Sequence, residues 1–270
     1  MIIMENHPNM KNDCNYLELL GFGLLRFKRI NSEWTYENVF QKGIGLPLLQ
    51  NLIEAYKKEI IANNKGHSVI PLENMTVFLQ YFKLSQDNII LLVYMDKTDH
   101  EITYSDLYLF TKRIRKSFES NIQIEQIIDQ CEDYIEIPMS NDLIALFIIG
   151  PHGQPLYSKI DKDRTTVANS EVHIGGFISA LFSFSQEIIG QESGGNLKEI
   201  NFGNQRFYLI TNNNVIFAFL VEQLDDLLER YMYLITNEFV DQYKEVLKNF
   251  NGDIRKFKDF EKTLDKYFIL

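Results

Sequence analysis

Cysteine, proline and glycine are scarce in this 270-residue chain, which contains 2, 6 and 14 of them respectively. So few prolines and glycines argue against long flexible linkers and favour compact packing. The two cysteines, Cys14 and Cys131, stand in no CxxC or Cys/His spacing. The sequence therefore predicts neither a zinc site nor a disulfide framework, and a reducing compartment such as the cytoplasm fits this cysteine usage.

Positive charge is also in short supply, because 27 Lys and Arg against 37 Asp and Glu give a net charge of -10. Nucleic-acid binding draws much of its free energy from neutralised phosphates, so we expect no nucleic-acid partner. The apolar runs over 89–95 and 143–149 are far shorter than the roughly 20 residues that span a bilayer, and they predict buried strands. Residues 1–8 lack a basic region followed by a long apolar run, so we expect no signal peptide there.

Enzyme signatures are missing as well. The chain has no GxSxG or HExxH motif, and its glycine-rich stretch 190–196 lacks the lysine of a phosphate-binding loop. The acidic pair Asp225 and Asp226 fits the start of a helix better than a catalytic site. We therefore expect a protein that is not an enzyme, with no catalytic, cofactor-binding or metal-binding residues and no cofactor.

The apolar pattern of the first half predicts two strands, a helix, two strands and two helices. The strands fall over 19–27, 34–40, 77–84 and 89–95, and the helices begin near Pro47 and cover 104–118 and 122–135. A third strand in front of residue 77 is unclear because Pro71 interrupts it.

The second half repeats this order of elements. Strands are predicted over 143–149, 156–160, 198–202, 206–210 and 215–221, with helices over 174–189, from Asp225 to about 250, and over 253–268. Both halves thus follow the order ββ-α-βββ-α-α, with the third strand of the first half unclear. This repeat predicts a mixed α+β fold with two similar domains, over 14–137 and 141–270.

The helix over 174–189 is the most informative segment for binding. Helical spacing predicts that one face packs on the sheet, formed by Ile174, Phe177, Ile178, Leu181, Phe184 and Ile188. The opposite face holds small residues where a solvated helix usually shows Lys or Glu, namely Gly176, Ser179, Ala180 and Ser183. Short side chains let another backbone approach closely, so these four residues are the candidate interface. An ordinary exposed Ser/Ala surface is the alternative.

The densest basic patch lies on the helix over 104–118 and consists of Lys112, Arg113, Arg115 and Lys116. On an acidic chain, such a patch is a candidate contact for anionic lipid headgroups or for an acidic partner. A plain solvated helix face is the alternative explanation.

Several segments together resemble the longin and roadblock group of proteins. They are the turn 150–153, Gly175-Gly176-Phe177 at the entry to a helix, and the stretches 198–203 and 215–218. The chain particularly resembles archaeal longin-like proteins and the tandem-longin subunits of Rab exchange factors. Residues 142–250 carry most of the likeness, and the first half follows mainly through its order of elements.

This resemblance implies two five-stranded antiparallel sheets, each with one helix on one face and two on the other. It implies a non-catalytic platform that recruits or regulates a small Ras-like GTPase in vesicle-trafficking processes. The implied partners are a small GTPase, another longin or roadblock protein, or a second copy of the chain. The implied location is cytoplasmic, with at most peripheral membrane contact. The alternatives are a pair of PAS- or GAF-like sensor domains for small molecules, which share a similar layout, and a hydrolase whose site is built from scattered residues.

Overall fold

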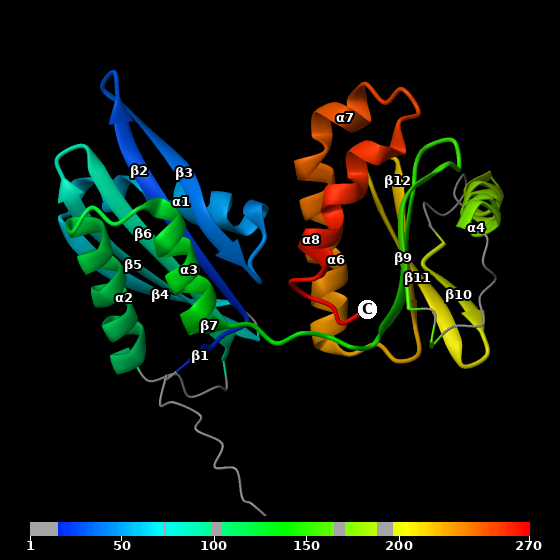
Figure 1. Cartoon of the computed structure of the whole chain (residues 1–270), viewed down its shortest axis with the longest axis horizontal. Coiled ribbons are helices and arrows are strands. Elements are labelled where there is room, and N and C mark those ends of the chain that lie inside the picture. The colour runs from blue at the N-terminus through cyan, green and yellow to red at the C-terminus, as the bar shows by residue number, and fades with distance from the viewer. Residues whose placement is uncertain (1–15, 73, 99–103, 162, 165–170, 188–196) are drawn as a thin grey trace, which may run out of the picture. The chain divides into compact units, whose positions relative to one another are not determined.

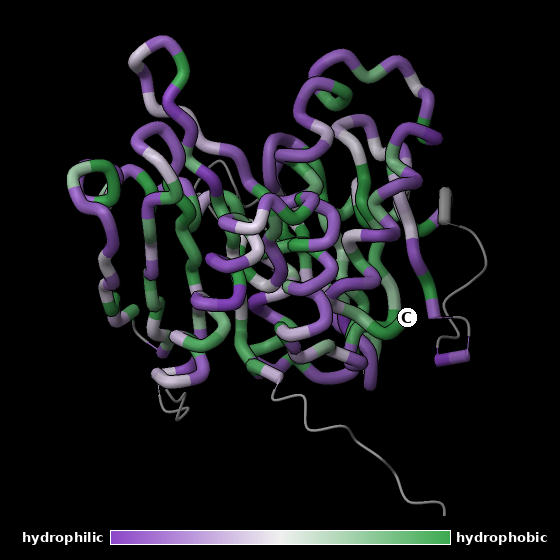
Figure 2. Tube along the Cα trace, turned by 60° about the vertical axis from the view of Figure 1, so that its left-hand side comes forward, coloured by the Kyte–Doolittle hydropathy of each residue, from purple (hydrophilic) through white to green (hydrophobic). Residues whose placement is uncertain are grey.

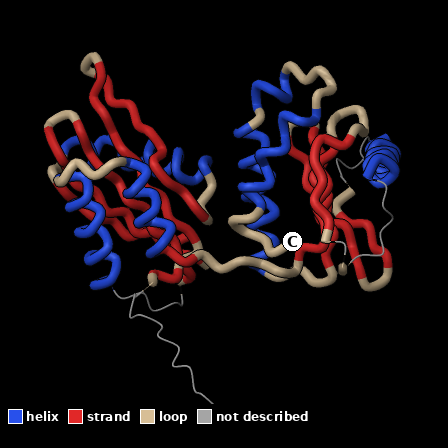
Figure 3. Tube along the Cα trace, in the orientation of Figure 1, coloured by secondary structure: helices blue, strands red, loops and turns tan. Residues whose placement is uncertain are grey.

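The structure is a computed structural model of the chain, and it describes residues 16–72, 74–98, 104–161, 163–164, 171–187 and 197–270. It has a mixed α+β fold with two five-stranded antiparallel sheets, as the sequence predicts (Figures 1 and 3). The chain divides into two compact units. The first holds the residues up to Lys42 together with Asn51–Ile137, and the second holds Gly43–Gln50 together with Pro138–Leu270.

The first half of the chain consists of a five-stranded sheet, its helices, and two short strands that pair in a separate two-stranded sheet. Its elements are β1 (Leu17–Glu18), β2 (Gly21–Ile30), β3 (Glu33–Lys42), α1 (Leu46–Ala62), β4 (Lys65–Leu72), β5 (Met75–Ser85), β6 (Asn88–Lys97), α2 (Tyr104–Glu119), α3 (Ile124–Tyr134) and β7 (Ile135–Glu136). The strand order across the sheet is β3-β2-β6-β5-β4. In the β2–β3 turn, Asn31 and Ser32 both have positive φ, which matches the twist of a tight hairpin.

Side chains from β5 show that helices cover both faces of this sheet. Tyr81 points toward α1, where its hydroxyl donates to the Glu59 carboxylate at 3.1 Å. The neighbouring Gln80 points the other way and accepts a hydrogen bond from Thr111 of α2. The central strand β6 is buried on both faces over 89–95, which explains its unbroken apolar sequence.

The unclear third strand of the first half is β4, which pairs antiparallel with β5 at the edge of the sheet. Pro71 lies inside β4 opposite Thr76, and an edge strand tolerates the missing N–H because one side of it has no strand to bond. The helix predicted over 122–135 ends one residue early. Ile135 and Glu136 instead form β7, which pairs in parallel with β1.

The second half of the chain holds a five-stranded sheet with the topology of the first. Its elements are β8 (Leu143–Ile149), β9 (Pro155–Ile160), α4 (Glu171–Ser185), β10 (Glu199–Phe202), β11 (Gln205–Asn212), β12 (Val215–Val221), α6 (Asp226–Gln242), α7 (Lys244–Lys248), the 3-10 helix η2 (Ile254–Phe260) and α8 (Glu261–Leu264). The strand order is β10-β11-β12-β8-β9, so in both sheets the opening hairpin lies at one edge and the third strand at the other. The repeated order of elements is confirmed.

Aromatic packing changes the predicted helices at the end of the chain. Asp225 caps α6 as expected, since its carboxylate accepts a hydrogen bond from the Leu228 N–H at 2.7 Å. The single helix predicted to residue 250 is wrong, because α6 ends at Gln242 and α7 follows it. The helix predicted over 253–268 is reduced to η2 and α8, whose Phe257 and Phe260 pack against Phe239 of α6.

Among the described residues, α4 covers one face of the second sheet, and α6 with the C-terminal helices covers the other (Figures 1 and 3). On the α4 face, Ile178 and Phe182 join an apolar cluster with inward residues of β8, β11 and β12. On the other face, Phe217 of β12 meets Phe239 of α6. In Figure 2 the apolar segments follow the strands of both sheets, as expected for sheets packed on both sides.

Candidate functional site

The orientation of α4 differs from the sequence prediction. Phe177 and Phe184, which we expected to face the sheet, are 46% and 62% exposed, and Leu181 is half-buried. Ile178 and Phe182 carry the packing instead. The reason lies at Gly175, which is buried close to the backbone oxygen of Gly153, so the helix rests on the β8–β9 turn. Ile188 lies outside the described residues.

The four predicted interface residues do not form one uniform face. Gly176, Ala180 and Ser183 are exposed, while Ser179 is half-buried beside Gly153. Ser179 and Ser183 also border a hollow of about 440 Å³ against the turns 150–151 and 211–214.

Exposed apolar residues lie next to the small ones on α4. We call Gly176, Phe177, Ala180, Ser183 and Phe184 the α4 outer face. The Phe177 ring centroid is 6.3 Å from that of Phe202, which belongs to the edge strand β10 and is 52% exposed. Apolar surface therefore runs from the helix onto the edge of the sheet.

The helix α1 occupies the same place in the first unit but has a different outer surface. Its exposed positions include Glu54, Ala55, Lys58 and Glu59, the mixture expected of a solvated helix. The fold therefore does not require aromatic residues at this place. The comparison singles out the α4 outer face as unusual.

The basic patch predicted on α2 divides between two sides of the helix. Lys112, Arg115 and Lys116 border a groove against β4 and β5. Arg113 lies elsewhere, with its guanidinium 5.5 Å from the ring centroid of Tyr134 on α3. Neighbouring residues on a helix point about 100° apart, so the side chains of these four residues cannot all lie on one side of α2.

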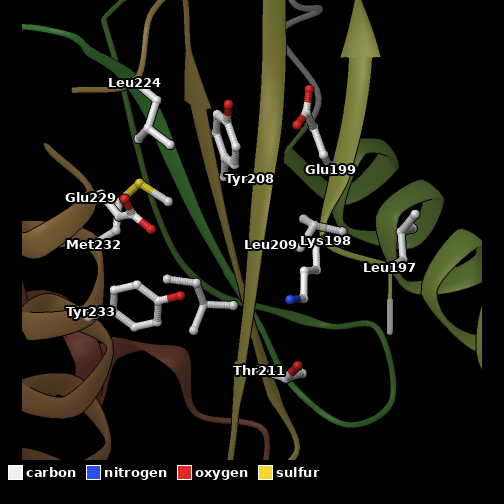
Figure 4. Close-up of a pocket in the computed structure, with 11 residues that line it drawn as sticks. Leu197, Lys198, Glu199, Tyr208, Leu209, Thr211, Leu224, Glu229, Met232 and Tyr233 are labelled. Carbon is white, nitrogen blue, oxygen red and sulfur yellow. The ribbon is translucent and has the colours of Figure 1, made fainter. Parts of the chain in front are cut away.

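The equivalent groove of the second unit lies between β10, β11 and α6 and has a volume of about 400 Å³ (Figure 4). Tyr208 borders it from the sheet, and Glu229, Met232 and Tyr233 border it from α6. Lys198 contributes one positive charge, and Glu229 and Glu199 contribute negative ones. This groove is mixed in charge and partly apolar, and sequence reasoning did not single it out.

The thiol of Cys131 is buried in α3, and burial raises its pKa to about 12, with the nearby Glu132 charge adding to the shift. At pH 8 the thiolate is therefore far rarer than in a free cysteine of pKa about 8.5, on the order of a hundredfold or more. In a Cys14→Ser variant, we expect an alkylating reagent to label the folded chain very slowly and the chain in guanidinium chloride quickly. Equal labelling rates in the two conditions would contradict this burial.

Within the described ranges, no three His, Cys, Asp or Glu side chains are grouped so as to hold a metal ion. No described helix has the length and apolar character needed to cross a membrane. The glycine-rich stretch 190–196 falls outside the described part of the chain. No family model matches this sequence, and no curated protein matches it.

Proposed function

We propose that this chain is a longin-like binding platform that recruits or regulates a small Ras-like GTPase without chemistry of its own. The α4 outer face carries the proposal, because it exposes Phe177 and Phe184 where the matching helix α1 exposes charged residues. Large exposed aromatic side chains that adjoin small residues are typical of surfaces that bind another protein.

The layout of each unit supports the longin part of the proposal. Both sheets have five antiparallel strands in the same order, and in the described part of the chain the opening hairpin is followed by α1 in the first and by α4 in the second. This is the arrangement that the resemblance of 150–153, Gly175-Gly176-Phe177 and 198–203 implies. Under the proposal the protein acts in the cytoplasm in membrane-traffic processes, with at most peripheral membrane contact.

The surface chemistry of α4 favours one mode of contact. Gly176 and Ala180 are one helical turn apart and exposed, so a partner helix or strand could approach the α4 backbone there. Phe177 and Phe184 flank this point and would bury their rings on binding. The edge strand β10 continues the surface through Phe202.

The test compares Ala180→Arg with Ala55→Arg, which places the same change on the exposed face of α1. We expect purified small GTPases from the source organism, loaded with GDP or a GTP analogue, to bind the unaltered chain. Ala180→Arg should weaken that binding by about tenfold or more, because a buried unpaired charge costs more than about 1.4 kcal/mol. Ala55→Arg should leave it unchanged.

Melting temperatures of both variants should stay near that of the unaltered chain, because both positions are exposed. The proposal fails if no small GTPase binds the unaltered chain, or if the two variants weaken binding equally. Turnover of GTP by the chain alone would contradict its non-catalytic part.

A further inference from the structure

The groove between α2 and the edge of the first sheet gathers positive charge on an otherwise acidic protein. Lys112, Arg115 and Lys116 border it from α2, and Lys65 and His67 border it from β4. We call these five residues the basic groove. Its volume is about 720 Å³, enough for a small molecule. The only acidic side chain among the residues that border it is Glu119.

The charges in the basic groove are largely uncompensated. The Glu119 carboxylate is already engaged by Arg115, whose Nε lies 2.8 Å from Oε1. The ion pairs found among the described residues include none of Lys65, Lys112 and Lys116. Like charges that face one space repel each other, and an anion bound between them removes that cost.

The walls of the basic groove are held in place. The Tyr94 hydroxyl lies 2.8 Å from the Thr111 hydroxyl, which donates to Gln80, so α2 is tied to both β6 and β5. The Arg115 guanidinium lies 5.5 Å from the ring centroid of Phe82. The backbone positions from which the lysines extend are therefore fixed, while the lysine side chains themselves are exposed.

The fold alone does not account for these charges. The equivalent groove of the second unit lies between the edge hairpin β10–β11 and α6. On the α6 side it is bordered by Met232, Tyr233 and Glu229. Two grooves of one topology therefore differ in charge. The basic residues are a property of the first unit and not of the architecture.

We propose that the basic groove binds a ligand that carries at least two phosphate groups. Lysine is a compact point charge that suits phosphate oxygens, and here lysines come from two opposite walls onto one bounded space. A ligand with several negative charges on neighbouring phosphate groups can meet lysines from both walls at once.

The phosphates could come from a soluble metabolite or from a lipid headgroup, and two arms of one experiment separate these sources. Titration calorimetry measures the binding of inorganic triphosphate to the full chain. Sedimentation measures binding to phosphatidylcholine vesicles that contain a polyphosphoinositide, beside vesicles that contain phosphatidylserine. Binding of triphosphate supports the site with a soluble ligand, and binding of polyphosphoinositide vesicles supports it with a lipid headgroup.

Substitutions then locate the binding. Lys112→Gln, Lys116→Gln and Lys65→Gln should each weaken it by about tenfold, the size of one charge-assisted hydrogen bond. Arg113→Gln is the matched control, because this cation sits on the same helix but faces Tyr134. It should leave binding unchanged.

The proposal is overturned if the chain binds neither triphosphate nor polyphosphoinositide vesicles, or if Arg113→Gln weakens binding as much as Lys112→Gln. It is also overturned if the chain binds phosphatidylserine vesicles as tightly as polyphosphoinositide vesicles, or if an equal concentration of poly-glutamate displaces triphosphate. The proposal does not depend on GTPase binding. The basic groove belongs to the first unit, whereas the α4 outer face belongs to the second.

Discussion

Truncation of Phe239 to alanine is expected to lower the free energy of unfolding of the second unit by about 3–5 kcal/mol. The Phe239 ring is fully buried and meets the rings of Phe217, Tyr243, Phe257 and Phe260 at centroid distances of 4.9 to 5.6 Å. It joins the sheet to α6 and to the C-terminal helices. Its loss would leave a cavity that several elements border and that none could fill alone.

Phe184→Ala is the matched control, since it makes the same chemical change at a ring that is 62% exposed. We expect it to alter stability by no more than about 0.5 kcal/mol. Urea denaturation followed by far-UV circular dichroism measures both variants. If both truncations were costly, the assigned orientation of α4 would be wrong. If neither were, the aromatic core around Phe239 would be wrong.

Gly66→Ala is expected to destabilise the first unit by about 1–3 kcal/mol through overpacking. A Cβ at this position would lie 2.2 Å from the Tyr81 hydroxyl oxygen and 2.3 Å from the ring carbon that bears it. The Tyr81 ring would have to move. It is buried, and its hydroxyl donates to Glu59 at 3.1 Å, so that movement would also weaken the link between β5 and α1.

A double-mutant cycle separates this clash from the intrinsic effect of replacing glycine by alanine in a strand, which alone favours folding by about 0.5–1 kcal/mol. Tyr81→Leu removes the atoms that the new Cβ would meet, so Gly66→Ala should cost much less in that background. Trp34, the chain's single tryptophan, lies in β3 of the same sheet, so its fluorescence in urea reports on this unit. Equal costs in the two backgrounds would exclude the proposed contact.

Sequence pattern predicted the central strands of both five-stranded sheets and the edge strands β3, β9 and β10, and left only the edge strand β4 unclear. The strands over 143–149 and 215–221 were predicted to the residue, because both are continuous apolar runs bounded by turns. The strand β4 alternates between exposed and half-buried positions and contains Pro71, so its pattern alone is ambiguous. Only its pairing with β5 shows that it completes the sheet.

Long-range packing explains the other differences. The orientation of α4 depends on how closely Gly175 approaches the β8–β9 turn, which helical spacing cannot reveal. The C-terminal helices are interrupted where Tyr243 and Phe257 pack together, a contact between residues far apart in the pattern.

The basic groove could be predicted in part. Lys112 and Lys116 stand at helical spacing on one side of α2, a pattern that would have separated them from Arg113. The place of Lys65 in the groove could not be predicted from the sequence, because only the β4–β5 register brings it beside α2. Sequence reasoning placed Phe177 in the core because large apolar residues are usually buried, and so missed the aromatic part of the α4 outer face.

Hydrogen–deuterium exchange of the chain with and without a bound small GTPase tests the proposed platform most directly. The proposed function predicts slower exchange of backbone amides in α4 and β10 on binding, with the amides of α1 unchanged. The opposite result, protection on α1 or elsewhere while α4 and β10 exchange as in the free chain, would contradict the assignment of the α4 outer face as the partner surface.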